Sequence, residues 1–234
     1  EAGVWYDPSA ASGSLDWQRN LLEYTESFDN GYWGKGRGTV QANTATAPNG
    51  TSTADTFTET TANGSHYVVA TLETLPSKTF TVSGYVKAKS RTFAAIGLQQ
   101  NTSANSYIGS TFIHFNLSTG AYSASSNGGT EPTNVSYSIE SVGDGWYKIS
   151  VTGTLASNAG KVQSLLAPST GSTHNYQGDG TSGIYLWGAQ LEEASTASSY
   201  QPIISTFENA FKAAFPSHTL YQDYQGVTPV TAVG

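Results

Sequence analysis

Short runs of alternating apolar and polar residues fill the chain between about residues 20 and 202. Clusters of glycine, asparagine, serine and proline separate these runs. Such alternation is typical of a β-strand with one face buried and the other facing water, and the clusters are typical of the turns between strands. The pattern therefore predicts an all-β protein made of two stacked antiparallel sheets, a β-sandwich.

The two clearest runs are residues 79–88 and 145–155. Their alternate apolar positions are expected to face the core: Phe80, Val82, Val86 and Ala88 in the first, and Tyr147, Ile149, Val151 and Leu155 in the second. Further strands are expected at 65–73, 92–99, 107–117 and 182–192, with turns at Asn127-Gly128-Gly129 and Asp144-Gly145. In the last of these strands Tyr185 and Trp187 alternate with Ile184 and Leu186, so we expect it to be covered on both faces.

The composition supports a folded, all-β protein. Only 12% of the 234 residues are charged, yet 14 Tyr, 9 Phe and 5 Trp supply core material that disordered chains lack. The net charge of −7 repels phosphate backbones and anionic membranes, so we expect no nucleic acid partner and no membrane insertion. Without cysteine the chain has neither disulfides nor thiolate metal ligands.

Three regions follow from the change of pattern along the chain. Residues 1–19 are interpreted as an N-terminal arm, residues 20–202 as the sandwich, and residues 203–234 as a short amphipathic helix with an extended tail. The helix is predicted from a capping box at Ser205 and Glu208 and from a stripe of three phenylalanines, Phe207, Phe211 and Phe215. This stripe fits packing against the chain's own sandwich or a self-association seam.

Catalytic and metal-binding patterns are weak. The adjacent acids Glu192 and Glu193 point to opposite faces of a strand, and the four histidines show no ligand spacing, so we expect no enzyme activity. A structural Ca²⁺ site is the one cofactor that we consider, with Glu26, Asp55 and Glu192 as candidate oxygen ligands. Solvated surface charge is the simpler interpretation of each of these three residues.

The sequence contains more residues suited to sugar binding than to catalysis or metal binding. Aromatic rings stack on the C–H faces of a pyranose, and amide and hydroxyl side chains hydrogen-bond its hydroxyl groups. Trp146 and Tyr85 lie on the polar faces of their predicted strands, where a large ring has no core to fill. With Gln99 and His114 they form the predicted ligand-binding set, although single exposed aromatic residues are also common on ordinary surfaces.

Several segments, taken together and in order, resemble a module of bacteriophage virion proteins. The resemblance covers about residues 3–234 and is carried by N-L-L-E-Y-T-E-S-F-D-N-G-Y-W (20–33), T-A-P-N-G-T-S-T-A-D (46–55), G-D-G-W-Y-K-I-S-V (143–151) and G-D-G-T-S-G-I-Y-L-W-G-A-Q-L-E (178–192). It implies a jelly-roll sandwich similar to carbohydrate-binding modules, on a tail fibre, spike or head appendage of the extracellular particle. It implies no transferable set of binding residues.

The resemblance also implies the partners. They are host cell-surface glycans, other virion proteins and further copies of the chain, with a trimer favoured. Two functions agree with the sequence almost equally well. One is a glycan-binding adsorption module, and the other is a purely structural decoration or connector protein. A glycan-cleaving enzyme is the distant third, because no pair of carboxylates stands out in the sequence.

Overall fold

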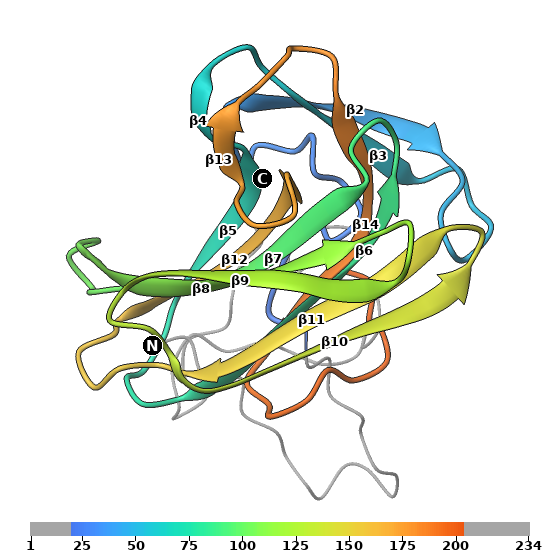
Figure 1. Cartoon of the computed structure of the whole chain (residues 1–234). Coiled ribbons are helices and arrows are strands. Elements are labelled where there is room, and N and C mark those ends of the chain that lie inside the picture. Colours follow the sequence, from blue (N-terminus) through green and yellow to red (C-terminus); the bar gives the residue numbers. More distant parts are fainter. Residues whose placement is uncertain (1–19, 204–234) are drawn as a thin grey trace, which may run out of the picture.

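The computed structural model describes residues 20–203, which form fourteen strands and contain no helix. Two six-stranded sheets lie face to face, with a separate two-stranded ribbon beyond one end (Figure 1). The predicted antiparallel β-sandwich is confirmed. The strands are β1 (Gly34–Gly36), β2 (Gly38–Ala45), β3 (Ala54–Glu59), β4 (Asn63–Ser65), β5 (Tyr67–Glu73), β6 (Thr79–Ala88), β7 (Phe93–Asn101), β8 (Tyr107–Asn116), β9 (Ala121–Gly129), β10 (Thr133–Gly143), β11 (Trp146–Thr154), β12 (Lys161–Ser169), β13 (Asn175–Gln177) and β14 (Gly183–Glu192).

Each sheet combines strands from distant parts of the chain. The first sheet has the order β1-β5-β12-β7-β8-β9, and the second has the order β10-β11-β6-β14-β3-β2. All strand pairs are antiparallel, and β4 pairs with β13 in the small ribbon. β12 lies between β5 and β7, so a strand late in the chain completes the centre of the first sheet.

The core lies between the two sheets and uses the alternation seen in the sequence. β6 buries Phe80, Val82 and Val86, while Ile149 and Val151 of β11 face the same interior. Both predicted inward faces are therefore confirmed, and Trp33 is fully buried in the same core. Because the burial of one such side chain contributes roughly 1.5–3 kcal/mol, this layer is the main source of stability.

A second apolar layer covers the outer face of the second sheet. Trp187 is 4% exposed and packs beside Tyr85, Tyr185 and Tyr200, whereas Ile184 on the same strand belongs to the core. Coverage of both faces of β14 is confirmed. The indole nitrogen of Trp187 donates a hydrogen bond to the hydroxyl of Thr53 at 3.0 Å, so the buried ring leaves no unpaired donor.

The two ends of the described chain meet at β14. The side-chain amide of Asn20 donates to the carbonyl of Ala189 at 3.0 Å and to that of Gln201 at 2.9 Å. The backbone amide of Thr25 donates to the carbonyl of Ile203 at 2.8 Å. The predicted arm and the predicted Phe-striped helix fall outside the described residues and stay predictions.

The structure also differs from the expected turns and strands. Asp144 and Gly145 form the predicted turn, with φ values of 51° and 77°. Asn127-Gly128-Gly129 is not a turn but the end of β9, where it pairs with β8. The prediction was wrong because cross-strand hydrogen bonding outweighs the turn preference of these residues. In the described part of the chain, no helix is long and apolar enough to cross a membrane.

Candidate functional site

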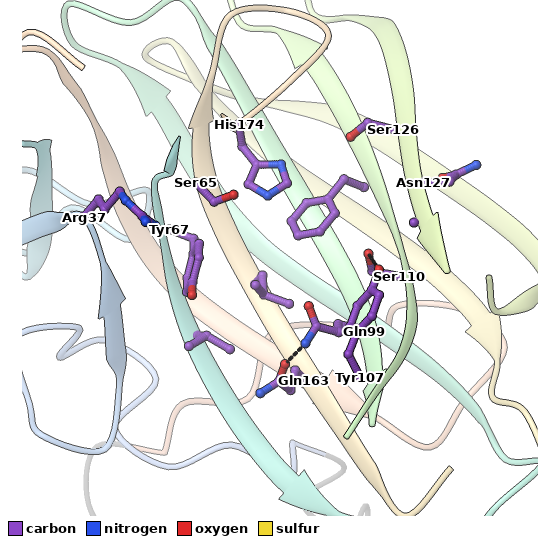
Figure 2. A pocket seen from close by; sticks show the side chains of 14 residues that line it. Arg37, Ser65, Tyr67, Gln99, Tyr107, Ser110, Ser126, Asn127, Gln163 and His174 are labelled. Carbon is purple, nitrogen blue, oxygen red and sulfur yellow. Dashed lines mark hydrogen bonds between the residues drawn. The ribbon is translucent and has the colours of Figure 1, made fainter. Parts of the chain in front are cut away.

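A groove of about 470 Å³ runs across the outer face of the first sheet. Figure 2 shows its lining side chains, which come from β5, β12, β7, β8 and β9 and from the segments at its ends. They are Arg37, Ser65, Tyr67, Val69, Gln99, Tyr107, Ser110, Phe112, Ser126, Asn127, Gly128, Gln163, Leu165 and His174. Alternation places them there, because these strands bury their other face in the core.

The floor of the groove is apolar. Phe112 and Leu165 form a small outer cluster with Ala95 and Ala167, against which Tyr67 packs. The ring of Phe112 lies directly over Gly97 of the neighbouring strand, where a Cβ atom would approach the ring to 2.4 Å. A residue with a side chain at this position would therefore displace the ring from the floor.

Two tyrosines stand on opposite sides of this floor (Figure 2). Tyr67 is half-buried, and Tyr107 is 52% exposed. The hydroxyl groups of Tyr107 and Ser110 are hydrogen-bonded at 3.0 Å, which orients the exposed ring. Each ring offers an apolar face with a polar tip, a combination that can stack on a sugar ring and hydrogen-bond at its edge.

Amide groups line the centre of the groove. Gln99 donates a hydrogen bond to the side-chain oxygen of Gln163 across the β7–β12 pair, and Gln163 donates to the hydroxyl of Thr71 at 2.7 Å. At the rim, the side-chain oxygen of Asn127 accepts from Thr111 at 2.8 Å. These chains of neighbours fix the orientation of the amides, so that their remaining donors and acceptors face the groove in a defined pattern.

His174 closes one end of the groove. Its ring stacks on Phe112 with the ring centroids 3.9 Å apart, and its Nδ1 atom is buried without a hydrogen-bond partner among residues 20–203. Burial lowers the pKa of His174 to about 4, with a further contribution from His66. The ring is therefore neutral at neutral pH and acts as a flat surface with a polar edge.

A buried carboxylate anchors the segment that carries His174. Glu59 accepts hydrogen bonds from Arg91, from the Tyr176 hydroxyl at 2.7 Å and from the backbone amide of Asp179 at 3.0 Å. Burial alone would raise the pKa of Glu59, but these hydrogen bonds together with the charge of Arg91 hold it below its usual value. The segment around β13 is thereby fixed to the end of β3.

The side chains that line the groove are suited to holding a ligand. Among the described residues, no aspartate or glutamate lines it, so it lacks the pair of carboxylates with which most glycosidases act. It offers instead an apolar floor, two tyrosine rings, and amide and hydroxyl groups. This is the combination that a polyhydroxylated ligand requires.

Two of the four predicted ligand residues lie at or beside the groove. Gln99 lines it directly, as described above. His114 lies just behind the lining, fully buried, with one ring nitrogen hydrogen-bonded to Ser169 at 2.7 Å and the other to Ser126 at 2.8 Å. Burial lowers the pKa of His114 to about 4, so it positions Ser126 as a neutral ring.

The other two lie on the opposite sheet. Trp146 is only 1% exposed, and its indole nitrogen donates to the carbonyl of Thr46 at 3.0 Å. The expectation of an open ring was wrong, because the segment between β2 and β3 covers the outer face of β11. Tyr85 is half-buried between Trp187 and Tyr200, and a ligand contact there stays a prediction.

The three candidate metal ligands are occupied as hydrogen-bond acceptors. Asp55 accepts from the backbone amides of Phe28 at 2.8 Å and Asn43 at 2.9 Å. Glu26 accepts from Thr53 and Tyr200, and Glu192 from Gln190 and Ser198. No group of three acidic or histidine side chains within residues 20–203 is arranged to hold a metal ion, so these carboxylates do not form one shared site. Calcium held by one of them with backbone oxygens stays a prediction.

Sequence reasoning missed most of the groove. Tyr67, Tyr107, Phe112 and Gln163 were not singled out, and Gln163 lies on β12, a strand that was not predicted. The feature that could have indicated the groove is that two amide residues, Gln99 and Gln163, occupy paired positions on neighbouring strands. It becomes visible only when the pairing of β7 with β12 is known.

Comparisons with known proteins give remote structural similarities. The enzymatically active domain of tailspike protein 4 from bacteriophage CBA120 is matched with a TM-score of 0.47 and 12% identity over 74% of this chain. This chain spans 21% of that protein, about a fifth of its length. The xylan-binding domain from CBM 22, formally the x6b domain, gives a TM-score of 0.45 and 13% identity over 77% of this chain and 99% of the domain.

A third similarity is to the CBM22-1 xylan-binding domain of Xyn10C from Paenibacillus barcinonensis. It has a TM-score of 0.42 and 13% identity over 76% of this chain and 96% of that domain. No protein-family model matches the sequence. No curated protein matches it either. At this level of identity and TM-score, these similarities assign no function to this chain.

Proposed function

We propose that this chain is a non-catalytic glycan-binding module whose ligand lies in the groove of the first sheet. The observation that carries the proposal is the facing pair Tyr67 and Tyr107 above a floor of Phe112 and Leu165, with the amides of Gln99 and Gln163 between them. A sugar ring placed there meets apolar surfaces with its C–H groups and amides with its hydroxyl groups.

The shape and rigidity of the groove favour this ligand class. Five paired strands form its floor, so the contacting side chains are fixed before a ligand arrives. The groove is open and lies across the strands of a sheet, which suits part of a long chain better than a small enclosed molecule. The lack of carboxylates in the described lining favours binding of a glycan over its cleavage.

We place the module on a bacteriophage particle, in an adsorption appendage such as a tail fibre or spike. The support is the set of sequence segments that resemble virion modules, from residues 20–33 to residues 178–192. In this setting the groove would hold the particle against host cell-surface glycans. Weak individual grooves would act together in a homo-oligomer, with a trimer favoured, because linked sites bind with a high effective concentration.

The test is a screen of the full chain against an array of bacterial surface polysaccharides, followed by titration of the best ligand. Tyr67→Ala and Tyr107→Ala should each weaken binding about tenfold, since each removes an aromatic contact of roughly 1 kcal/mol or more. Tyr122→Ala is the matched control, because Tyr122 is exposed and does not line the groove. Equal losses in all three variants, or no binding to any polysaccharide, would contradict the proposal.

A second candidate function, a structural decoration or connector protein, is favoured by one observation. The edge strands β9 and β10 expose apolar side chains at the open side of the sandwich, namely Tyr122, Val135, Tyr137 and Val142. Large exposed apolar residues along an edge are common where copies or neighbours associate. If Tyr137→Ser abolishes the oligomer measured by light scattering while no glycan binds, the structural role is the better account.

A further inference from the structure

We infer that the groove takes an acidic glycan and that Arg37 binds its anionic group. The inference rests on the proposed function and names the class of sugar that the groove prefers. Arg37 is the one charged residue among the described residues that line the groove. The chain as a whole carries a net charge of −7, so this groove has a local charge opposite to that of the molecule.

The guanidinium group of Arg37 has no polar partner in the described part of the chain. Among residues 20–203 it has neither an ion pair nor a side-chain hydrogen bond, whereas Arg91 is bound to Glu59. In the described part of the chain, the carboxylate of Glu131 is hydrogen-bonded to a lining residue, Asn127, whose amide donates to it at 2.8 Å. Asn127 and Arg37 lie on opposite sides of the groove in Figure 2.

The backbone holds Arg37 in place against a conformational cost. Its φ is 44°, a left-handed value that costs a residue with a Cβ atom about 1 kcal/mol or more. The carbonyl of Arg37 accepts hydrogen bonds from the backbone amide of Thr60 at 2.9 Å and from Nδ1 of His66 at 2.8 Å. Strain of this kind persists where the surroundings fix the residue, and it is common at ligand sites.

The side chain is also directed by its neighbours. It lies over Gly64, where a Cβ atom would come within 2.5 Å of the guanidinium carbon. Figure 2 shows Arg37 on the same side of the groove as Tyr67 and Ser65. A sugar ring stacked on Tyr67 would therefore lie on the side of the groove that holds the guanidinium group.

The chemistry of arginine selects an oxyanion. A guanidinium group donates two parallel hydrogen bonds to a carboxylate or a phosphate, and such charge-assisted bonds are roughly twice as strong as neutral ones. Uronic acids and phosphorylated sugars present these groups on an otherwise hydroxylated ring. The expected ligand is a glycan that carries one or the other at regular intervals.

The experiment measures the affinity of the full chain for matched pairs of oligosaccharides. One panel holds uronic acid oligosaccharides, each paired with its carboxyl-reduced neutral form. The other holds sugar-phosphate oligosaccharides, each paired with its dephosphorylated form. The variants are Arg37→Gln, which removes the charge, Arg37→Lys, which keeps it, and Lys89→Gln, which makes the same change of net charge at an exposed residue outside the groove lining.

We expect the charged member of at least one pair to bind about tenfold more tightly, as one charge-assisted contact provides. Arg37→Gln should abolish this preference, while Arg37→Lys and Lys89→Gln retain it in full or in part. Equal affinity for charged and neutral members, or a preference that survives in Arg37→Gln, overturns the inference and leaves glycan binding intact. Failure of every member to bind, neutral ones included, overturns the proposed function as well.

Discussion

Glu59 shows how one buried residue supports the groove from outside it. Its side chain is fully buried, whereas that of its partner Arg91 is 25% exposed. The same carboxylate receives the Tyr176 hydroxyl and the Asp179 amide, so three parts of the chain meet at one charge. Removal of that charge leaves a largely buried guanidinium, whose other contacts are the Asp179 carboxylate at 3.8 Å and the ring of Tyr176.

We predict that Glu59→Gln lowers the free energy of unfolding by about 3 kcal/mol, because one member of a buried ion pair is lost and the other stays. Urea denaturation measures this loss. The matched control is Glu193→Gln, which breaks the exposed pair with Lys78 and should cost less than about 1 kcal/mol. Similar small effects of both changes would show that the Glu59 network contributes little.

His174 and His114 make stability depend on pH. Burial lowers the pKa of each from 6.5 to about 4. Above pH 6.5 both are neutral in the folded and the unfolded chain, and their contribution to stability is complete. As the pH falls towards 4, the unfolded chain binds protons that the folded chain excludes, and stability is lost. Asp55 acts in the opposite direction, because burial raises its pKa from 3.8 to about 6.

We predict that His174→Phe flattens this pH dependence. Phenylalanine keeps the stack on Phe112, does not titrate and removes the unpaired Nδ1 atom. Wild type should lose up to about 3 kcal/mol more than the variant as the pH falls from 6.5 to 4, from the shift of one group. Unfolding curves at both pH values measure the difference, and parallel losses in the two proteins would contradict the assignment.

At the scale of the elements, the pairing of β7 with β8 sets the floor of the groove. We predict that Gly97→Ala weakens glycan binding about tenfold, because the new methyl group forces the Phe112 ring out of the floor and away from His174. The cost in stability should be about 1–3 kcal/mol. Titration of ligand, with circular dichroism as the folding control, tests this. Unchanged affinity would exclude Phe112 from the site.

The strands that were easiest to predict are those in which apolar and polar residues alternate in the sequence. In β6 and β11, apolar residues that face the core alternate with polar residues. The core residues include Phe80, Val82, Ile149 and Val151. β12 was missed because Leu165 and Ala167 of its outer face pack under the groove while Leu166 packs in the core. Apolar residues on both faces remove the alternation from which a strand is recognised.

The candidate site could be predicted only in part, because the pattern of a single strand does not show which other segments lie beside it. Gln99 lies in the groove lining, and it was predicted as a ligand residue because an amide in a strand is a reasonable sugar contact. Trp146 was misplaced because alternation gives the face of a strand but not what covers that face, and here a loop does. Arg37 and His174 lie outside the predicted strands and reach the groove through the long-range pairing of β4 with β13 and of β1 with β5.

At the scale of the whole molecule, residues 20–203 contain both sheets, the core and the groove. We predict that this fragment alone unfolds in one cooperative step and binds glycan with the affinity per site of the full chain. The closure of its two ends through Asn20 and Ile203 is the reason. Calorimetry and titration of the fragment test it. A fragment that aggregates or unfolds gradually would show that residues outside 20–203 complete the fold.

The most direct test of glycan binding in the groove is an NMR titration that follows the side-chain amides of glutamine. With the best polysaccharide from the array, the signals of Gln99 and Gln163 should shift in a saturable manner, because both amides line the groove. Those of Gln100 and Gln190 should not, since their amides are bound to Thr130 and Glu192 away from it. Shifts confined to Gln100 or Gln190, or to the sheet that contains Tyr85, would contradict the account.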